Sequence, residues 1–191
     1  MRAFLPILAV ATAPFSCVAV AYPPTAPVDP VQVFLLRQGS HTGLILPAEE
    51  HAEGAWVEYA FGSWGWYGEG NRGAAYELYA ITVPNRSALG RRSSKEHPAR
   101  DAALLQRGAE LQSFAAERAL VATLRRELDE EFAAAGVTPR LVEESGLLVV
   151  PARQEYALNY NCSDATINWM RRLGCSVPIG GITRSIELRE D

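Results

Sequence analysis

Two residues far apart in the sequence have the types and surroundings that thiol chemistry requires. Cys162 follows Asn161 in NYNCSDATINWMRRLGC, where the pattern predicts the first turn of a helix. His41 stands in RQGSHTGLIL, at the mouth of a predicted strand and beside glycine-containing turns. In cysteine catalysis the thiolate is the nucleophile, and an imidazole can take the proton of the thiol. Cys162 and His41 are therefore the candidate nucleophile and base of a Cys–His site.

The helix predicted from residue 162 to about 173 has one apolar face, which should point inward. The positions of this face are Cys162, Ala165, Thr166, Trp169 and Leu173. Asn161 is a favoured N-cap residue and Asp164 completes a capping box; Asn161 is also a candidate substrate-binding residue. Unpaired N–H groups at a helix start stabilise a thiolate and can bind an oxyanion. The alternative is a packing cysteine, because free cysteines are among the most buried residues.

A Cys–His site needs a third group that fixes the imidazole, and Glu58 is the candidate. It is the acidic residue in the middle of the apolar stretch WVEYAFG. If this stretch pairs with TGLILP as a neighbouring strand, Glu58 can lie beside His41; otherwise it is an exposed carboxylate. The other histidines, His51 and His97, have polar, loop-like surroundings, which predict solvent exposure.

The sequence gives little support to metal, cofactor or serine-hydrolase chemistry. The sequence has no H-x-x-x-H, no C-x-x-C and no carboxylates at ligand spacing, so we expect no metal and no cofactor. A G-x-S-x-G elbow is missing as well. The glycine-rich segment 62–73 is not predicted to be a phosphate loop, because its glycines do not lie between a predicted strand and a predicted helix. Its aromatic residues Trp64, Trp66 and Tyr67 predict either a substrate-binding rim or a structural turn folded over the core.

The elements that must position these residues are short strands followed by helices. Residues 31–36, 42–47, 56–62 and 76–84 have strand composition and predict an antiparallel meander. Apolar residues at helical spacing predict a helix over about 115–135, with Ser113 as its cap, and 146–150 predicts a further strand. The expected fold class is α+β, with a small antiparallel sheet packed against helices.

Composition predicts one globular domain. The chain has 191 residues, of which 48% are hydrophobic and 21% charged. The net charge of −4 argues against nucleic acid as a partner, and Lys95 is the only lysine among the eighteen basic residues. Cys162 and Cys175 should both be free thiols, because thirteen residues of helix would separate them by roughly 20 Å.

The N-terminal segment predicts export to the periplasm or cell envelope. Residues 1–21 combine Arg2, an apolar stretch and the small-x-small sequence Ala19-Val20-Ala21, which is typical of a cleaved signal peptide. A retained membrane anchor and lipidation at Cys17 are the alternatives. Residues 22–30 hold four prolines and predict a linker, so the domain should span 31–191.

Three segments together carry a family resemblance: SHTGLILP, WVEYAFGSWGWY and NCSDATINWMRRLGCSV. Over about residues 31–178 the chain resembles a bacterial family of uncharacterised exported proteins that was first catalogued in the urease gene region. More distantly it looks like the circularly permuted papain-like superfamily, which includes NlpC-type peptidases and lecithin:retinol acyltransferase-like proteins. This resemblance implies that Cys162 is the nucleophile, His41 the base and Glu58 the orienting group.

The sequence thus predicts an exported thiol hydrolase or acyltransferase. It would act on an amide or ester bond of a peptide, cell-wall fragment or lipid. One alternative is a non-catalytic envelope-binding module that uses the aromatic segment 62–73. Another is an accessory protein of the envelope that associates with the membrane through an uncleaved N-terminus.

Overall fold

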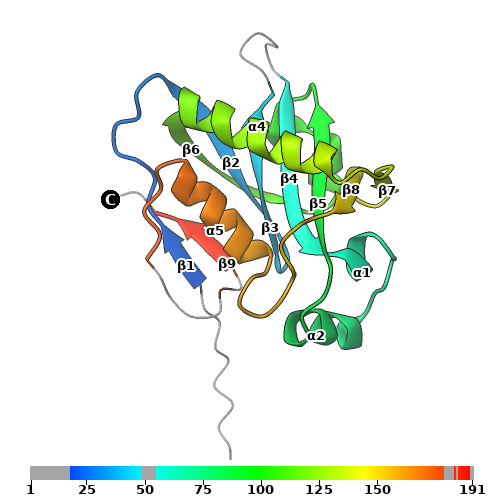
Figure 1. Ribbon diagram of the computed structural model, residues 1–191. Coiled ribbons are helices and arrows are strands. Elements are labelled where there is room, and N and C mark those ends of the chain that lie inside the picture. Colours follow the sequence, from blue (N-terminus) through cyan, green and yellow to red (C-terminus); the bar gives the residue numbers. More distant parts are fainter. Residues whose placement is uncertain (1–17, 49–54, 179–182, 184, 190–191) are drawn as a thin grey trace, which may run out of the picture.

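The computed structural model describes residues 18–48, 55–178, 183 and 185–189. A seven-stranded antiparallel sheet forms its centre, in the spatial order β6-β2-β3-β4-β5-β8-β7 (Figure 1). Its strands are β2 (Pro30–Gln38), β3 (His41–Pro47), β4 (Trp56–Ser63), β5 (Ser87–Ser94), β6 (Glu110–Glu117), β7 (Arg140–Val142) and β8 (Leu147–Pro151). A parallel pair, β1 (Val18–Ala21) with β9 (Ser185–Leu188), forms a separate two-stranded sheet.

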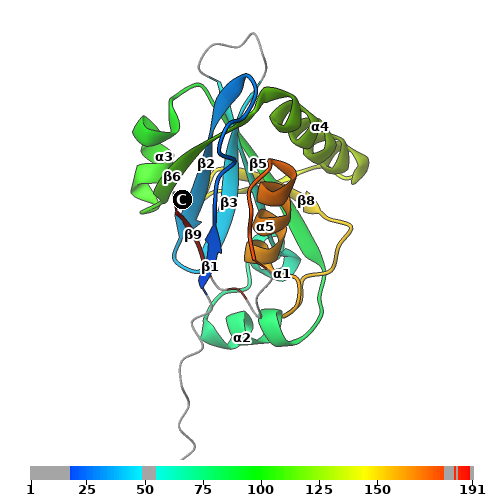
Figure 2. The same ribbon diagram turned by 90° about the vertical axis from the view of Figure 1, so that its left-hand side faces the viewer.

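Helices cover both faces of the large sheet. They are α1 (Trp64–Tyr67), α2 (Ala74–Thr82), the 3₁₀ helix η1 (Pro98–Arg100), α3 (Ala102–Gln106), α4 (Arg118–Ala134) and α5 (Cys162–Arg172). Figure 2 shows α3 on one side of the sheet and α4 and α5 on the other. The fold is therefore mixed α+β, with a large antiparallel sheet and few helices.

The main core lies between the sheet and the two longer helices. Strand β3 alternates so that Leu44 and Leu46 face this core, together with Tyr59 of β4 and Leu124 of α4, and all four side chains are almost fully buried. Alternation of side chains along a strand brings such residues to one face. The opposite face of β3 carries Ile45, which packs with Leu104 of α3 in a second, smaller cluster.

Several sequence predictions are confirmed. Strands β2, β3 and β4 form the expected meander, and β8 matches the strand predicted at 146–150. Helix α5 begins at Cys162, and Asn161 and Asp164 form the predicted capping box. The predicted inward face of α5 is buried throughout. The helix predicted over 115–135 is α4, but its N-cap is Glu117, because Ser113 lies within β6.

The prediction of a strand at 76–84 is wrong, because Ala74–Thr82 form helix α2. Tyr, Ile and Thr gave this segment its strand composition, yet it leaves Leu78 and Tyr79 exposed. The fourth place in the meander belongs to β5, which pairs with β4 along its whole length from Ser87 to Ser94. Its sequence, SALGRRSS, has weak strand propensity, so tertiary pairing decides its structure.

The N-terminal part of the described chain packs against the domain. Val18–Ala21 lie within the predicted signal peptide, but here they form β1 and pair with β9. Ala21 is fully buried, and Tyr22 N–H donates to Ser176 O at 2.9 Å. Residues 1–17 of the predicted signal, including Cys17, lie outside the described residues. Within the described residues, no helix has the length and apolar character to cross a bilayer.

Candidate active site

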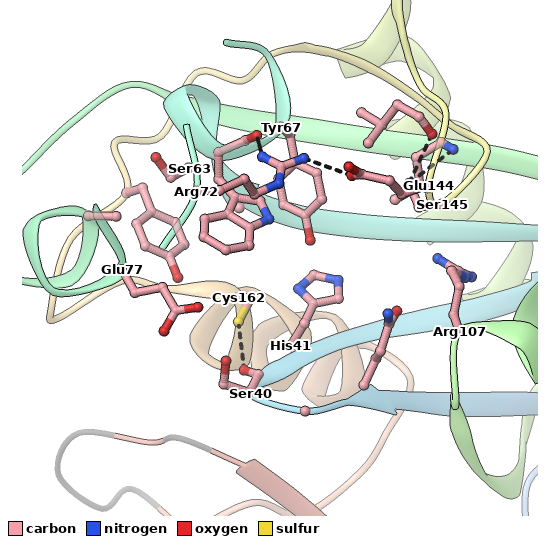
Figure 3. A pocket seen from close by; sticks show the side chains of 18 of the residues that line it. Ser40, His41, Ser63, Tyr67, Arg72, Glu77, Arg107, Glu144, Ser145 and Cys162 are labelled. Atoms are coloured by element: carbon pink, nitrogen blue, oxygen red, sulfur yellow. Dashed lines mark hydrogen bonds and ion pairs between the residues drawn. The ribbon is translucent and has the colours of Figure 1, made fainter. Parts of the chain in front are cut away.

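The start of α5 and the start of β3 meet at one cavity. Cys162 and His41 both line it, and its volume is about 410 Å³. Figure 3 shows the two side chains lying next to each other, one from the helix and one from the strand. Sequence analysis paired these residues, which are 121 positions apart, and the fold brings them together.

The sulfur of Cys162 lies among groups that stabilise its thiolate. Burial acts to raise the pKa of this thiol, but the hydrogen bond and the positive charge of His41 act against it. The backbone N–H of Thr42 and the hydroxyl of Tyr156 add further hydrogen bonds. Together these groups hold the pKa of Cys162 below its usual range. As a neutral thiol, Cys162 Sγ donates to Ser40 O at 3.6 Å.

A buried hydrogen bond joins the two elements that carry the site. Thr42, directly after His41, donates from its Oγ1 to Oγ1 of Thr166 at 3.2 Å. Thr166 lies one turn after Cys162 on the same face of α5. Both threonines are buried, with at most 1% of their surface exposed. This contact fixes the helix against the strand within one residue of His41 and one turn of Cys162.

The imidazole of His41 is held on one side by Tyr67. Their rings meet edge to face, with centroids 5.8 Å apart. Tyr67 fits here because residue 62 is glycine: a Cβ at Gly62 would lie 2.3 Å from its ring. Among the described residues, none makes a hydrogen bond with His41 Nε2, which is buried. This nitrogen therefore has no orienting group in the described part of the chain.

The structure corrects the expected place of Glu58. Strands β3 and β4 do pair, but their register sets Glu58 opposite Ile45, four residues beyond His41. The carboxylate is buried and accepts hydrogen bonds from Arg92 Nε and Arg107 Nη2, each at 2.9 Å. Glu58 therefore binds two arginines instead of orienting the imidazole.

The aromatic segment contributes two of its three candidates to the cavity. Trp66 and Tyr67, both in α1, line it. Trp64 is not among the lining residues; it packs under the guanidinium of Arg86, which lies 5.6 Å from its ring centroid. Arg72 lies at the rim of the cavity. Its guanidinium lies over the ring of Trp66 and forms an ion pair with Glu144 at 2.9 Å.

The side chain of Asn161 caps helix α5 and does not line the cavity. Its side-chain oxygen accepts from Ser163 N–H at 2.8 Å, and its amide nitrogen donates to Thr183 O at 3.4 Å. It is buried and does not line the cavity. The predicted cap is thus confirmed, and the structure gives no support to substrate binding by this side chain.

Sequence reasoning missed two residues of the site, Tyr156 and Arg107. Both line the cavity. Tyr156 lies in the irregular stretch before α5 and Arg107 just after α3, so neither position carries a periodic or motif signal. The composition of these segments gave no indication that their side chains reach Cys162 or Glu58.

The remaining candidates lie elsewhere. His97 is exposed, as predicted, and caps η1 by accepting from Ala99 N–H at 3.3 Å. His51 is outside the described residues. Cys175 is a free thiol like Cys162, but burial raises its pKa to about 12. Across the described ranges, no group of three or more His, Cys, Asp or Glu residues is placed to hold a metal ion.

Comparisons with known proteins identify no relative of this chain. A scan of protein-family models, a search of curated proteins and a search of solved structures each return no match to the chain.

Proposed function

We propose that this protein is a cysteine hydrolase or acyltransferase of the permuted papain-like kind, acting on an amide or ester bond. The observation that carries the proposal is a cysteine at the first position of a capped helix, next to a strand-borne histidine on an open cavity. The helix-on-sheet arrangement and the chain order, histidine before cysteine, support the papain-like assignment. The N-terminal sequence supports a place in the periplasm or envelope.

The site residues suffice for an acyl-transfer cycle. His41 takes the proton of Cys162, and the thiolate attacks the substrate carbonyl carbon to form a C–S bond. The resulting oxyanion can accept from the N–H of Cys162, which has no intrahelical acceptor at this position, and from the hydroxyl of Tyr156. The C–N or C–O bond then breaks, and His41 returns its proton to the leaving group.

The second half of the cycle regenerates the thiol. Water, or the hydroxyl or amine of an acceptor, attacks the thioester carbonyl while His41 removes its proton. The C–S bond breaks, and the sulfur regains a proton from His41. Water as the acceptor gives hydrolysis, and another nucleophile gives acyl transfer.

The test is to trap the acyl-enzyme with an activated ester. Wild-type protein incubated with p-nitrophenyl acetate should release p-nitrophenol in a burst and carry one acetyl group on Cys162, as located by peptide mass spectrometry. Cys175→Ala is the matched control and should behave like wild type. Cys162→Ala should lose the burst and the adduct, and His41→Asn should slow the burst by about 100-fold or more.

A different result would favour the binding-module alternative. If Cys162 acquires no acetyl group while the folded protein is intact, or if His41→Asn leaves the burst unchanged, the Cys–His pair is not a catalytic unit. The cavity with Trp66 and Tyr67 would then be a candidate for ligand binding without chemistry.

A further inference from the structure

We propose that Arg107 makes part of this cavity a subsite for a carboxylate, so that the substrate of Cys162 carries an anionic group away from its reacting carbonyl. The inference rests on the proposed function and adds a substrate class to it. Figure 3 shows Arg107 on the side of His41 that is farther from Cys162. The subsite and the nucleophile therefore belong to one cavity but to different parts of it.

The guanidinium of Arg107 is held by three hydrogen bonds and keeps one nitrogen free for a ligand. Nη2 donates to Glu58 Oε1 at 3.1 Å and to Oε2 at 2.9 Å, and Nε donates to Ala103 O at 3.3 Å. Only 7% of the side chain is exposed. In the described part of the chain, no group accepts a hydrogen bond from Nη1, and Arg107 lines the cavity. Nη1 can therefore donate to a molecule in the cavity.

A chain of buried charges fixes Arg107 in this orientation. Arg92 forms ion pairs with two carboxylates, those of Glu58 and Asp101. Its Nε lies 2.9 Å from Glu58 Oε2 and its Nη1 lies 2.9 Å from Asp101 Oδ2. Asp101 in turn accepts from two backbone N–H groups at the start of α3. The two arginines balance the two carboxylates, so the cluster is neutral. A donor held in place in this way loses little conformational entropy when it binds a ligand.

Arg107 differs from the second arginine of the cavity. Arg72 is exposed at the rim, where it pairs with Glu144 and lies over Trp66. Arg107 is buried in the wall, where hydrogen bonds to a charged acceptor are stronger because water is scarce. A carboxylate oxygen can accept a charge-assisted hydrogen bond from the one free nitrogen, Nη1, and such a bond is stronger than one to a neutral acceptor. Glu58 offsets part of the positive charge, so we expect a several-fold preference for anions.

The test compares two alkylating reagents that differ only in charge. N-iodoacetyl-β-alanine carries a carboxylate, and its primary amide is neutral. The second-order rate constant of each with Cys162 is measured at constant ionic strength by peptide mass spectrometry, and their ratio reports the preference for the anion. The wild-type ratio should exceed that of a small thiol in solution, and Arg107→Gln should lower the ratio by about fivefold.

Three further variants separate charge recognition from structural damage. Glu58→Gln removes the offsetting charge and should raise the ratio, opposite in sign to Arg107→Gln. Arg107→Lys keeps the charge and should retain most of the preference. Arg126→Gln, an arginine on the exposed side of α4, is the matched control and should leave the ratio unchanged.

The double variant Glu58→Gln with Arg107→Gln keeps the cluster neutral and provides the measurement if a single variant does not fold. Its ratio should be lower than that of wild type, because the Arg107 donor is missing, but higher than that of Arg107→Gln, because the negative charge of Glu58 is also removed. Rapid labelling of Cys162 with a ratio that none of the Arg107 and Glu58 variants changes would overturn the subsite and leave the proposed function standing. If neither reagent labels Cys162 in the folded protein, both the subsite and the proposed function are overturned.

Discussion

Cys162 illustrates how several modest interactions act on one sulfur atom. Its burial disfavours a thiolate, yet His41, the Thr42 amide and the Tyr156 hydroxyl together lower its pKa. For Cys175, burial is the cause that shifts the pKa, and it raises the pKa to about 12. We therefore expect the two cysteines to differ in reactivity because of the groups around them and not because of exposure.

Tyr156→Phe should raise the apparent pKa of Cys162. The variant removes the hydroxyl that hydrogen-bonds to the thiolate and keeps the ring that stacks on Phe61. A hydrogen bond to a charged group contributes about 1.5–3 kcal/mol, so the expected rise is about one pKa unit or more. The pH dependence of the rate of alkylation measures it.

Tyr160→Phe is the control for that variant. Tyr160 also packs against Phe61, edge to face with ring centroids 5.4 Å apart, but its hydroxyl is not one of the main groups that shift the pKa of Cys162. The apparent pKa of Cys162 should therefore stay at the wild-type value. Equal shifts in the two variants would assign the effect to packing on Phe61 and would contradict a role for the Tyr156 hydroxyl.

At the scale of elements, the site depends on how α5 is fixed against β3. The Thr42–Thr166 hydrogen bond is buried, and each hydroxyl would lose its partner if the other were removed. An unsatisfied buried hydroxyl costs more than the loss of both partners together. This pair therefore allows a test of positioning that leaves Cys162 and His41 in place.

Thr42→Val and Thr166→Val should each lower the free energy of unfolding by about 1–2 kcal/mol, and the double variant by less than the sum. Urea denaturation measures all three. We also expect slower alkylation of Cys162 in the single variants, because helix and strand are less firmly joined. Strictly additive losses would show that the two hydroxyl groups do not interact.

Local signals made some elements predictable. Asn161 and Asp164 are a capping motif contained in four residues, and the sequence therefore located the helix start that carries Cys162. The sequence places Glu58 in an apolar strand and leaves its exposure open, and the structure shows it buried. Its partners could not be predicted, because they depend on the strand register and on Arg107, which follows a helix absent from the sequence prediction.

Segments whose structure depends on distant partners were predicted poorly. β5 has a weak strand sequence and is ordered by pairing with β4 and β8. The segment that forms α2 has strand-like composition, but the place beside β4 that it would have occupied is taken by β5. Tyr156 and Arg107 reach the cavity from irregular positions before α5 and after α3, so sequence analysis found Cys162 and His41 but neither of these two residues.

At the scale of the whole molecule, the two described ends of the chain are joined. β1 pairs with β9 from Val18 to Ala21, and Arg189 N–H donates to Ala21 O at 3.0 Å. β9 also packs near α5, and Ile186 is fully buried in the main core. The strand that would be lost by cleavage before Tyr22 is thus part of the packing around the site's helix.

A chain that begins at Tyr22 should be less stable than one that begins at Val18. Removal of β1 exposes part of β9 and breaks its backbone hydrogen bonds, and we expect a loss of about 2 kcal/mol in the free energy of unfolding. Urea denaturation of the two purified chains measures this. Equal stabilities would show that β1 contributes nothing to the fold.

The most direct test of the central claim is the rate at which iodoacetamide alkylates Cys162 in the folded protein between about pH 5 and 9, measured for wild type and His41→Ala. Mass spectrometry separates Cys162 from Cys175, which should stay unlabelled because its pKa is about 12. We predict fast labelling of Cys162 with an apparent pKa well below the ~8.5 of an ordinary thiol, and a higher apparent pKa in His41→Ala. Labelling that is slow at every pH and unaffected by His41 would contradict the thiolate–imidazole site.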